Sequence, residues 1–323
     1  MASLARKLPL LDIPNRRSSH STPTPRGGGL AIVIVASICF MFLAGIGVLN
    51  SDLTVCLLLG GICIAFVGLL DDIFGVPAWM RLFVHFGIAI LTLVLLDLAP
   101  AILIGHQTLE LSGPWRAISI LAIVWSINLF NFMDGIDGIA AVEAIFITLS
   151  MSALASYLGL SRQFVVATIA VTAASTGFLV WNWPPAKLFM GDVGSGYLGY
   201  LVAVFGLSAG SESSIAIPVW LIISAWFLAD ATVTLVRRIA RMERIFEAHR
   251  SHAYQKLARK LGSHARVTCG LTVLNVVFLL PAAAWAIAHP PQATLVALLV
   301  LIGASALVWS FGAGKRGEGS QHV

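Results

Sequence analysis

Long apolar segments recur along the whole chain, and they constrain its fold more than any other feature. A helix needs about 20 mostly apolar residues to cross the hydrocarbon core of a bilayer. About ten such segments follow one another, at residues 30–49, 53–70, 83–104, 117–133, 139–160, 163–181, 197–209, 215–236, 267–288 and 293–312. Of the 323 residues, 58% are hydrophobic and only 11% are charged, whereas soluble domains carry about 25% charged residues. We therefore predict an all-α, polytopic membrane protein with about ten transmembrane helices.

The polar parts of the chain are short, so we expect one integral membrane domain over residues 1–323. Residues 1–29 are polar, basic and rich in proline and glycine, and they predict a cytoplasmic N-terminal segment rather than a cleavable signal peptide. A second polar stretch, residues 237–266, predicts one long loop between two spans.

Positively charged residues are distributed very unevenly between the segments that separate the spans. When these segments are numbered alternately from the N-terminus, only Arg116 and Arg162 fall in one set. Lys and Arg concentrate in cytoplasmic loops, so we expect the other set to face the cytoplasm. The net charge of +5 then reflects topology and anionic headgroups, and we expect no nucleic acid partner. The residues of the cytoplasmic set are Arg6, Lys7, Arg16, Arg17, Arg26, Arg81, Lys187, Arg237, Arg238, Arg241, Arg244, Arg250, Lys256, Arg259, Lys260, Arg266, Lys315 and Arg316.

Five aspartates lie at or just beyond the cytoplasmic ends of three predicted spans. Asp71 and Asp72 follow the second span, Asp134 and Asp137 the fourth, and Asp192 the sixth. A carboxylate at a helix C-terminus faces the negative end of the helix dipole, which is unfavourable without a nearby cation. A single aspartate there would usually be a cap or turn residue. Five on one membrane face, in turns rich in Gly or Asn, indicate a bound metal or a cationic ligand.

The fourth span ends in a repeated three-residue spacing of amides and acids. Asn128, Asn131, Asp134 and Asp137 follow one another at this step, which keeps their side chains near one face of a helix. Amide and carboxylate oxygens are hard ligands that suit Mg²⁺, or Mn²⁺, rather than zinc. The same membrane face carries candidate substrate-binding groups, and this combination is typical of metal-assisted chemistry on a diphosphate. The basic and imidazole groups are His20, Arg26, Arg81, Lys187, His249, Arg250 and His252.

Five motifs follow one another between residues 12 and 257. They read DIPNRRSSHSTPTPRGGGLAI, GLLDDIFGVPAWMRL, NLFNFMDGIDGIA, FMGDVGSGYLG and HRSHAYQKL. Together they resemble the polyprenyl-phosphate N-acetylhexosamine-1-phosphate transferases (glycosyltransferase family 4). HRSHAYQ and PTPRGGG are most similar to the branch that initiates O-antigen and enterobacterial common antigen, and the run of histidines expected in the peptidoglycan enzyme is missing. Family members usually begin with one further membrane helix, whereas only about a dozen residues precede the first motif here.

The resemblance implies a reaction, its partners and its place in the cell. The donor would be a UDP-HexNAc, the acceptor undecaprenyl phosphate, and the products undecaprenyl-diphospho-HexNAc and UMP, with Mg²⁺ as cofactor. The enzyme would be a multi-pass protein of the bacterial inner membrane with a cytoplasmic active site, and a homodimer is possible. Such an enzyme initiates O-antigen or another cell-envelope glycan. The identity of the sugar does not follow from the motifs.

The resemblance also implies roles for residues at the first aspartate pair and at the metal. Asp71 and Asp72 match the catalytic pair near the lipid phosphate, and Asp71 would be the base or would orient that phosphate. Asn131 and Asp192 match the metal-binding residues. Arg81 stands where the family often has a phosphate-binding Lys.

Two further groups match residues on the nucleotide side of the family's site. Asp134 and Asp137 match catalytic acids there, with Asp137 near the uracil. His249, Arg250 and His252 match a loop that contacts the sugar and the phosphates.

Other classes of membrane protein remain as alternatives. A transporter would carry its acids near the bilayer centre, within broken helices, whereas these acids cluster at span ends. CDP-alcohol phosphatidyltransferases carry their acids in one contiguous stretch with an Arg that MDGIDGIAA lacks. A non-catalytic relative would not be expected to retain all the motif acids. Asp230 lies inside the eighth span, and we expect it either to function directly or to form an ion pair with Arg237.

Overall fold

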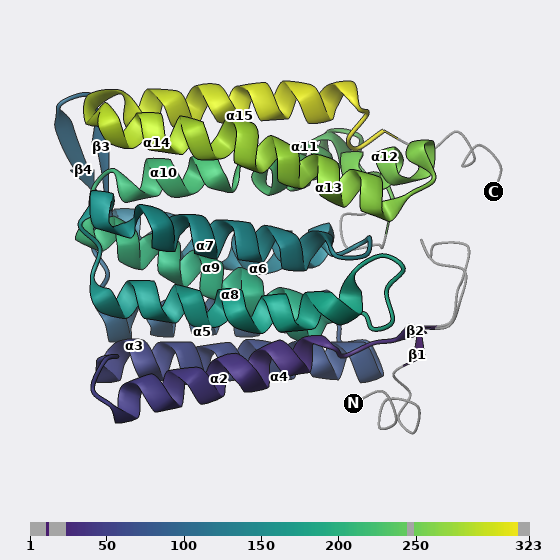
Figure 1. The fold of residues 1–323 in the computed structure, drawn as a ribbon, viewed down its shortest axis with the longest axis horizontal. Coiled ribbons are helices and arrows are strands. Elements are labelled where there is room, and N and C mark those ends of the chain that lie inside the picture. The colour runs from purple at the N-terminus through teal and green to yellow at the C-terminus, as the bar shows by residue number, and fades with distance from the viewer. Residues whose placement is uncertain (1–10, 13–23, 244–248, 316–323) are drawn as a thin grey trace.

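The protein is a bundle of helices, and most of the long ones run from one end of it to the other (Figure 1). The structure, a computed structural model, describes residues 11–12, 24–243 and 249–315. The helices are α2 (Gly29–Gly45), α3 (Ser51–Val55), η1 (Cys56–Gly60), α4 (Gly61–Phe74), α5 (Ala78–Leu96), η2 (Gly113–Trp115), α6 (Arg116–Met133), α7 (Ile139–Leu158), α8 (Arg162–Asn182), α9 (Asp192–Glu212), α10 (Ala216–Ile223), α11 (Ala225–Ala240), α12 (Ala253–Leu261), α13 (His264–Leu274), η3 (Asn275–Leu279), α14 (Leu280–Ala288), η4 (Pro290–Gln292) and α15 (Ala293–Ser310).

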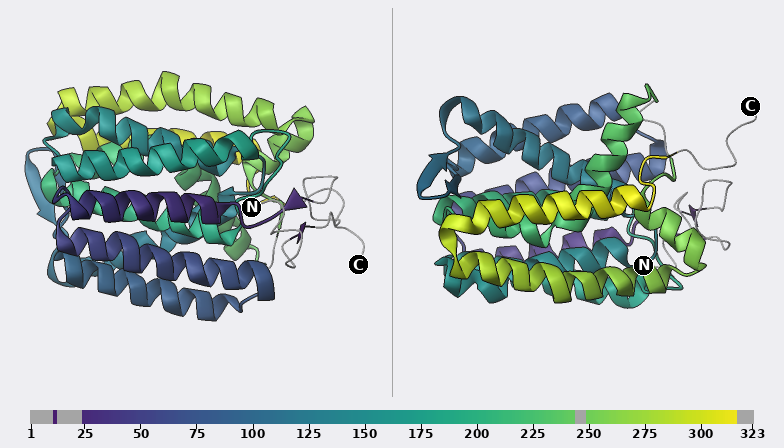
Figure 2. Two further views of the ribbon diagram at one scale, coloured as in Figure 1. Left: turned by 60° about the horizontal axis from the view of Figure 1, so that its bottom comes forward. Right: turned by 90° about the horizontal axis from the view of Figure 1, so that it is seen from above.

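The membrane-spanning elements confirm the predicted fold class. Eight helices are long and apolar enough to cross a membrane, the bent pair α10–α11 makes up to nine, and α2 is a shorter apolar helix. Each of the ten predicted apolar segments coincides with one of these elements. The helices run side by side in both views of Figure 2. We call the end of the bundle where α4, α6 and α8 finish the motif end, because all three aspartate motifs lie there (the right of Figure 1).

The third apolar segment was predicted too long. Helix α5 ends at Leu96, and residues 101–104 form strand β3 (Ala101–Ile104), which pairs antiparallel with β4 (Gln107–Glu110). The hairpin lies at the opposite end from the motifs (Figure 1). A second small sheet joins β1 (Leu11–Asp12) to β2 (Thr24–Pro25). Hydropathy alone did not distinguish an apolar strand from the end of a helix.

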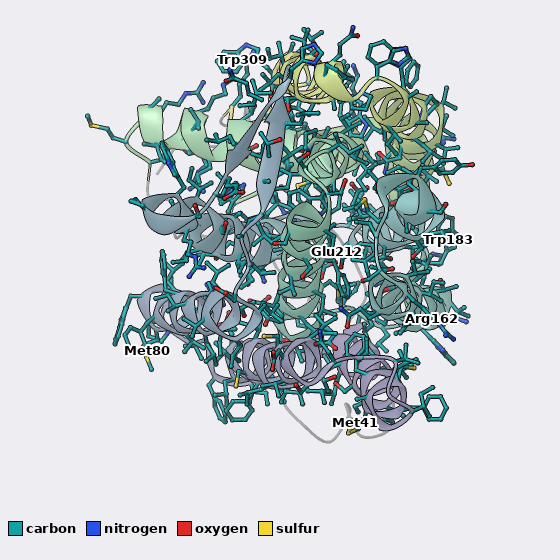
Figure 3. All side chains as sticks on the ribbon, turned by 90° about the vertical axis from the view of Figure 1, so that its left-hand side faces the viewer. Met41, Met80, Arg162, Trp183, Glu212 and Trp309 are labelled. Atoms are coloured by element: carbon teal, nitrogen blue, oxygen red, sulfur yellow. The ribbon has the colours of Figure 1, made fainter. Side chains whose placement is uncertain are left out.

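Helix α9 lies at the centre of the bundle and is almost completely buried. Figure 3 views the helices end-on and shows Glu212, the last residue of α9, in the middle of the section. Helices α4 and α6 pack along it. A Cβ at Gly199 would lie 2.4 Å from the backbone oxygen of Ser126, and one at Gly68 would lie 2.4 Å from that of Asp192. Small residues allow the three backbones to approach closely, and this approach brings the aspartate motifs together.

The long loop predicted over residues 237–266 contains ordered structure. Helix α11 continues to Ala240 after a bend of 72° from α10, and it departs from the bundle direction in the right-hand view of Figure 2. The short helix α12 follows at the motif end, and α13 begins at His264. Residues 249–252, which we call the histidine loop, lie directly before α12.

Candidate active site

Two aspartates from different helices meet on one arginine at the motif end. Asp71 lies in the last turn of α4, and Asp192 is the first residue of α9. Arg81, in the first turn of α5, donates from Nη1 to Oδ2 of both carboxylates, at 3.0 Å from that of Asp192. The tight connection between α4 and α5 allows this contact, because Gly75 adopts a left-handed conformation and its N–H caps the carbonyl of Asp71. Asp71 and Arg81, ten residues apart in the sequence, therefore form an ion pair across the connection between α4 and α5.

Asp72 holds the start of α9 in place. Its two carboxylate oxygens accept the backbone N–H groups of Asp192 and Val193, each at 3.1 Å. The turn before α9 passes close to this carboxylate, since a Cβ at Gly191 would lie 2.5 Å from Asp72 Oδ2. A negative charge at a helix N-terminus also interacts favourably with the helix dipole. Asp72 thus positions Asp192 against Arg81.

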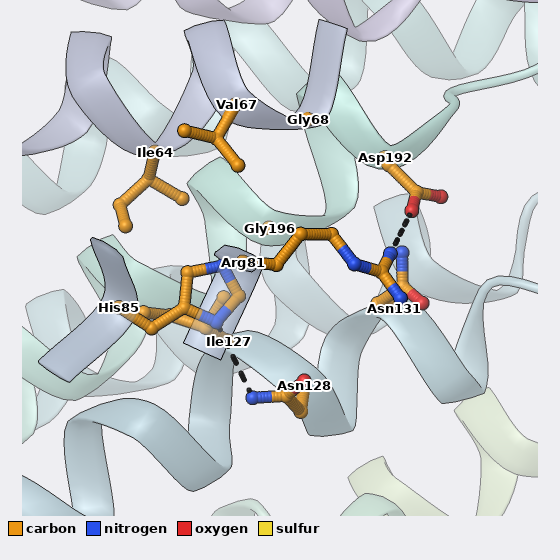
Figure 4. Close-up of a pocket in the computed structure, with 10 residues that line it drawn as sticks. All are labelled: Ile64, Val67, Gly68, Arg81, His85, Ile127, Asn128, Asn131, Asp192 and Gly196. Atoms are coloured by element: carbon orange, nitrogen blue, oxygen red, sulfur yellow. Dashed lines mark hydrogen bonds and ion pairs between the residues drawn. The ribbon is translucent and has the colours of Figure 1, made fainter. Parts of the chain in front are cut away.

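A small cavity of about 20 Å³, large enough for about one water, lies beside the Arg81–Asp192 pair (Figure 4). Asn128 and Asn131 line it together from α6. Asn131 donates to Ser195 Oγ at 3.4 Å, and Asn128 donates to the carbonyl of Val124 at 2.7 Å. The predicted metal ligands Asn131 and Asp192 therefore border the same cavity. Asn128 and Asn131 share a face of α6, as their spacing implied, whereas Asp134 and Asp137 lie beyond the last residue of the helix, Met133.

Asp134 lies close to several other charged groups of the site. It follows the last residue of α6 and is only partly exposed. Burial raises the pKa of Asp134 well above its usual value, and the carboxylates of Asp192 and Asp72 raise it further. Four carboxylates, those of Asp72, Asp134, Asp137 and Asp192, are thus close enough to affect one another electrostatically. A group that supplies positive charge here would relieve this repulsion.

Asp137 connects the loop after α6 and the loop after α8 to the start of α13. Its Oδ2 accepts the N–H of Ala186 at 3.0 Å, and its Oδ1 lies 3.3 Å from His264 Nδ1. Thr268 donates to its carbonyl at 3.1 Å. A cavity of about 540 Å³ opens at this point, and its walls include Arg250 and Arg259. The cavity has room for a group of several heavy atoms, and Asp137, Arg250 and Arg259 all line it.

The histidine loop packs against the end of α6. The rings of His249 and His252 stack with their centroids 5.0 Å apart, and His252 is almost fully buried. Tyr254 donates from its hydroxyl to the carbonyl of Phe132 at 2.9 Å. Burial lowers the pKa of His249 to about 3, and His252 and Arg238 act in the same direction. His249 is therefore neutral at physiological pH, and since its Nδ1 accepts from the backbone N–H of Ser251, its Nε2 is the donor nitrogen.

The comparisons with known proteins agree on one family. A family model described as Glycosyl transferase family 4 matches residues 54–210. A Bacillus subtilis protein named "Probable undecaprenyl-phosphate N-acetylglucosaminyl 1-phosphate transferase" is 30% identical over 85% of this chain and 77% of its own length. The chain belongs to glycosyl transferase family 4. This confirms the resemblance to the polyprenyl-phosphate N-acetylhexosamine-1-phosphate transferases.

Two further relatives carry names with different sugars. The decaprenyl-phosphate N-acetylglucosaminephosphotransferase of Mycobacterium leprae is 31% identical over 82% of this chain and 74% of the relative. The phospho-N-acetylmuramoyl-pentapeptide-transferase of Heliobacterium modesticaldum is 30% identical over 72% of this chain and 75% of the relative. The two names differ in the sugar, N-acetylglucosamine in the first and N-acetylmuramoyl-pentapeptide in the second, and only the first includes a polyprenyl phosphate.

Two of the remaining predicted site residues, Lys187 and His20, have no described contact with the aspartates of this family 4 site. Lys187 lies with its Nζ 5.9 Å from the ring centroid of Trp181, and none of its described contacts is with a carboxylate. His20 lies outside the described residues. In the part of the chain that is described, no group of three or more His, Cys, Asp or Glu side chains is placed to hold a metal ion by itself. The metal site therefore stays a prediction.

Asp230 is a site residue whose role the sequence left open. Its carboxylate accepts the backbone N–H groups of Ala253 and Tyr254, at 2.9 and 3.0 Å, and lies 3.4 Å from His252 Nδ1. Asp230 therefore caps α12 from α11 and fixes one side of the histidine loop. The expected ion pair with Arg237 is wrong, because Arg237 instead donates to the carbonyl of Ala313. Only the three-dimensional packing of α11 against α12 reveals this contact. His264, the partner of Asp137, was missed for the same reason.

Replacing Asp230 by alanine is expected to lower transferase activity about 100-fold, the cost of a displacement of about 1 Å at a catalytic centre. The change leaves two N–H groups of α12 without their acceptor, which costs about 1–2 kcal/mol. Thr234→Val is the matched control, because Thr234 makes only a 3.2 Å bond to the same carboxylate. Initial rates and unfolding midpoints of both variants in detergent check this expectation. Equal activity of Asp230→Ala and Thr234→Val would contradict it.

Proposed function

We propose that this family 4 protein transfers HexNAc-1-phosphate from a UDP-HexNAc to undecaprenyl phosphate. The reaction would initiate O-antigen or another cell-envelope glycan, at the cytoplasmic face of the bacterial inner membrane. The observation that carries the proposal is the meeting of Asp71 and Asp192 on Arg81 at a membrane-helix end. Acids and a guanidinium at the bilayer surface suit a reaction between a membrane-bound phosphate and a water-soluble diphosphate. A homodimer belongs to the same proposal.

The chemistry proposed is the exchange of one phosphoanhydride for another. An oxygen of the lipid phosphate attacks the phosphorus that carries the sugar, a new P–O bond forms, and the bond to the bridging oxygen breaks. UMP leaves with that oxygen. A phosphate monoester has a second pKa of about 6 and is mostly a dianion at pH 7, so the attack needs little help from a base. Asp71 would then orient the phosphate through Arg81 rather than remove an essential proton.

Several groups of this chain would bind and orient the two substrates. Arg81 would move between the carboxylates and the phosphates, since its present partners are Asp71 and Asp192. Arg250 and Arg259 line the 540 Å³ cavity and would neutralise donor phosphates. His249, neutral and stacked on His252, would donate a hydrogen bond from Nε2 to a sugar hydroxyl or to the acetamido carbonyl, because its Nδ1 accepts from the backbone N–H of Ser251.

The residues at the cavity fit Mg²⁺, or Mn²⁺, in their chemistry. Carboxylate oxygens of Asp71 and Asp192 converge on one cationic nitrogen, so a positive charge is required at this position. Asp192 and Asn131, which border the same cavity, would hold the ion through the hard oxygens that it prefers. When bound, it would supply neutralisation of the diphosphate charge.

A label-transfer experiment tests the proposal. Purified protein is incubated with undecaprenyl phosphate, Mg²⁺ and a panel of labelled UDP-HexNAc donors that includes the GlcNAc, FucNAc and QuiNAc forms and a MurNAc-pentapeptide form. We expect label in the lipid extract, an equal amount of UMP, and loss of both with EDTA. The best donor identifies the sugar. Folded protein that moves no label from any donor would contradict the proposal and favour a transporter or a non-catalytic relative.

A further inference from the structure

The chain segment that follows α15 returns to the histidine loop. We call residues 311–315 the strap. Its backbone carbonyls accept from basic side chains of two other elements: Arg237 donates to Ala313 at 2.7 Å, and Arg241 donates to Gly314 at 2.8 Å. Lys256, on α12, donates to the carbonyls of Gly312 at 2.6 Å and Lys315 at 2.9 Å. Positive side chains from α11 and α12 therefore hold the strap along its length.

The strap also contacts the histidine loop directly through the backbone. The N–H of Gly314 donates to the carbonyl of Ser251 at 2.8 Å. Ser251 stands between Arg250 and His252, and its hydroxyl lies 2.9 Å from His249 Nδ1. A shift of Ser251 would therefore move the groups that the proposed function assigns to the donor substrate. Asp230 secures the loop on the α12 side, and the strap secures it on the other.

The local conformation of the strap requires glycine. Gly314 has φ +70°, and a Cβ there would lie 2.8 Å from Arg237 Cβ and 3.1 Å from the carbonyl oxygen of Thr234. Gly312 has φ +83°. Left-handed backbone is unfavourable for residues with a side chain, and the carbonyl of Thr234 belongs to α11, which cannot shift easily. Arg237 is fixed as well, because its guanidinium carbon lies 3.6 Å from the ring centroid of Trp309. The sequence Gly-Ala-Gly and the surrounding cations thus specify one path for the strap.

We propose that the strap, residues 311–315, is a positioning element that holds the histidine loop in the geometry needed to bind the sugar-nucleotide donor. The inference rests on the proposed function, and it adds a role for a segment outside all five sequence motifs. A positioning role predicts that weakening the strap raises the KM for the donor while the acceptor site, built by α4, α5 and α9, keeps its KM for the lipid.

The experiment compares variants in matched pairs. Truncation after Ser310 removes the strap, and truncation after Gly317 keeps it. Gly314→Ala is paired with Gly303→Ala, since a Cβ at Gly303 on α15 has open space. Lys256→Met removes two hydrogen bonds, and Lys256→Arg can restore them. Each protein is assayed for transfer with both substrates varied, and backbone hydrogen–deuterium exchange is measured on peptides that cover residues 249–256.

For truncation after Ser310, Gly314→Ala and Lys256→Met we expect kcat/KM for the donor to fall about 10–100-fold, the range expected for a misplaced binding group. The KM for undecaprenyl phosphate should stay within about twofold, and exchange in residues 249–256 should become faster. The control truncation, Gly303→Ala and Lys256→Arg should resemble the unaltered protein. If kcat/KM falls equally for the donor and for undecaprenyl phosphate, the inference is wrong. It is also wrong if hydrogen–deuterium exchange in residues 249–256 does not change. Should Gly314→Ala fail to fold, the Lys256 pair decides.

The exchange measurement separates this inference from the proposed function. If the unaltered protein transfers no sugar phosphate, the proposed function fails, and faster exchange in the truncated protein would still show that the strap orders the loop. If the unaltered protein is active and the strap variants exchange normally, the proposed function stands and the inference fails.

Discussion

Replacing Asp192 by asparagine is expected to lower sugar-phosphate transfer about 1,000-fold, the loss typical of removing one group that stabilises charge in a transition state. The amide keeps the size of the side chain but removes the negative charge that faces Arg81 at 3.0 Å. It also removes the charged oxygen that a divalent cation would prefer at this cavity. The fold should survive, because Asp72 still caps α9 through backbone N–H groups.

The label-transfer assay and a thermal unfolding curve in detergent check the Asp192 prediction. Asp52→Asn is a suitable control, since Asp52 is an exposed aspartate in the first turn of α3, far from the motif end. We expect that control to keep full activity, and we expect both variants to unfold near the temperature of the unaltered protein. An active Asp192→Asn protein would show that the assignment of the metal-binding and charge-balancing role is wrong, even if the transfer reaction itself is observed.

Replacing Gly199 by alanine is expected to lower the free energy of unfolding by about 3 kcal/mol, at the upper end of the usual cost of overpacking. The added Cβ would lie 2.4 Å from the carbonyl oxygen of Ser126 and 2.8 Å from Cα of Ile127. Both are backbone atoms of α6, so relief requires α6 and α9 to separate. Transfer activity should fall as well, because α9 carries Asp192 and α6 carries Asn131.

The unfolding midpoint in detergent measures the effect of Gly199→Ala. The matched control is Gly177→Ala on α8, where a Cβ has nothing within 4 Å and where alanine favours the helix by about 1 kcal/mol. We expect the control to be at least as stable as the unaltered protein. Similar midpoints for the two variants would show that close packing of α6 on α9 is not essential to the fold.

Much of the fold could be predicted from the sequence because each span must be apolar over its whole length. The prediction was weakest at α9, where it began at residue 197 although the helix begins at Asp192. The apolar signal of α9 is interrupted by glycine and serine, which serve contacts with other helices rather than with lipid. It also failed at residues 97–104, where an apolar hairpin strand follows the helix.

The composition of the site could be predicted, but its pairings could not. Alternation of spans places Asp71, Asp134 and Asp192 at one end of the bundle, and the structure agrees. The partner of each side chain depends on helix packing, which leaves no periodic trace in the sequence. The cap that Asp72 forms on α9 spans 120 residues, and the contact of Asp230 with α12 depends on a bend of 72° in the chain.

The central position of α9 has a consequence for how the protein is made. Of the long candidate spans, within the part of the chain that the structure describes, α9 is the least hydropathic and the most buried. Its small residues let a neighbouring helix backbone pack closely, but they bury little apolar surface against a lipid chain. A nascent α9 thus gains more from helices already in the bilayer than from the lipid. Because α4 and α6 precede it in the chain, the order of synthesis delivers these two partners first.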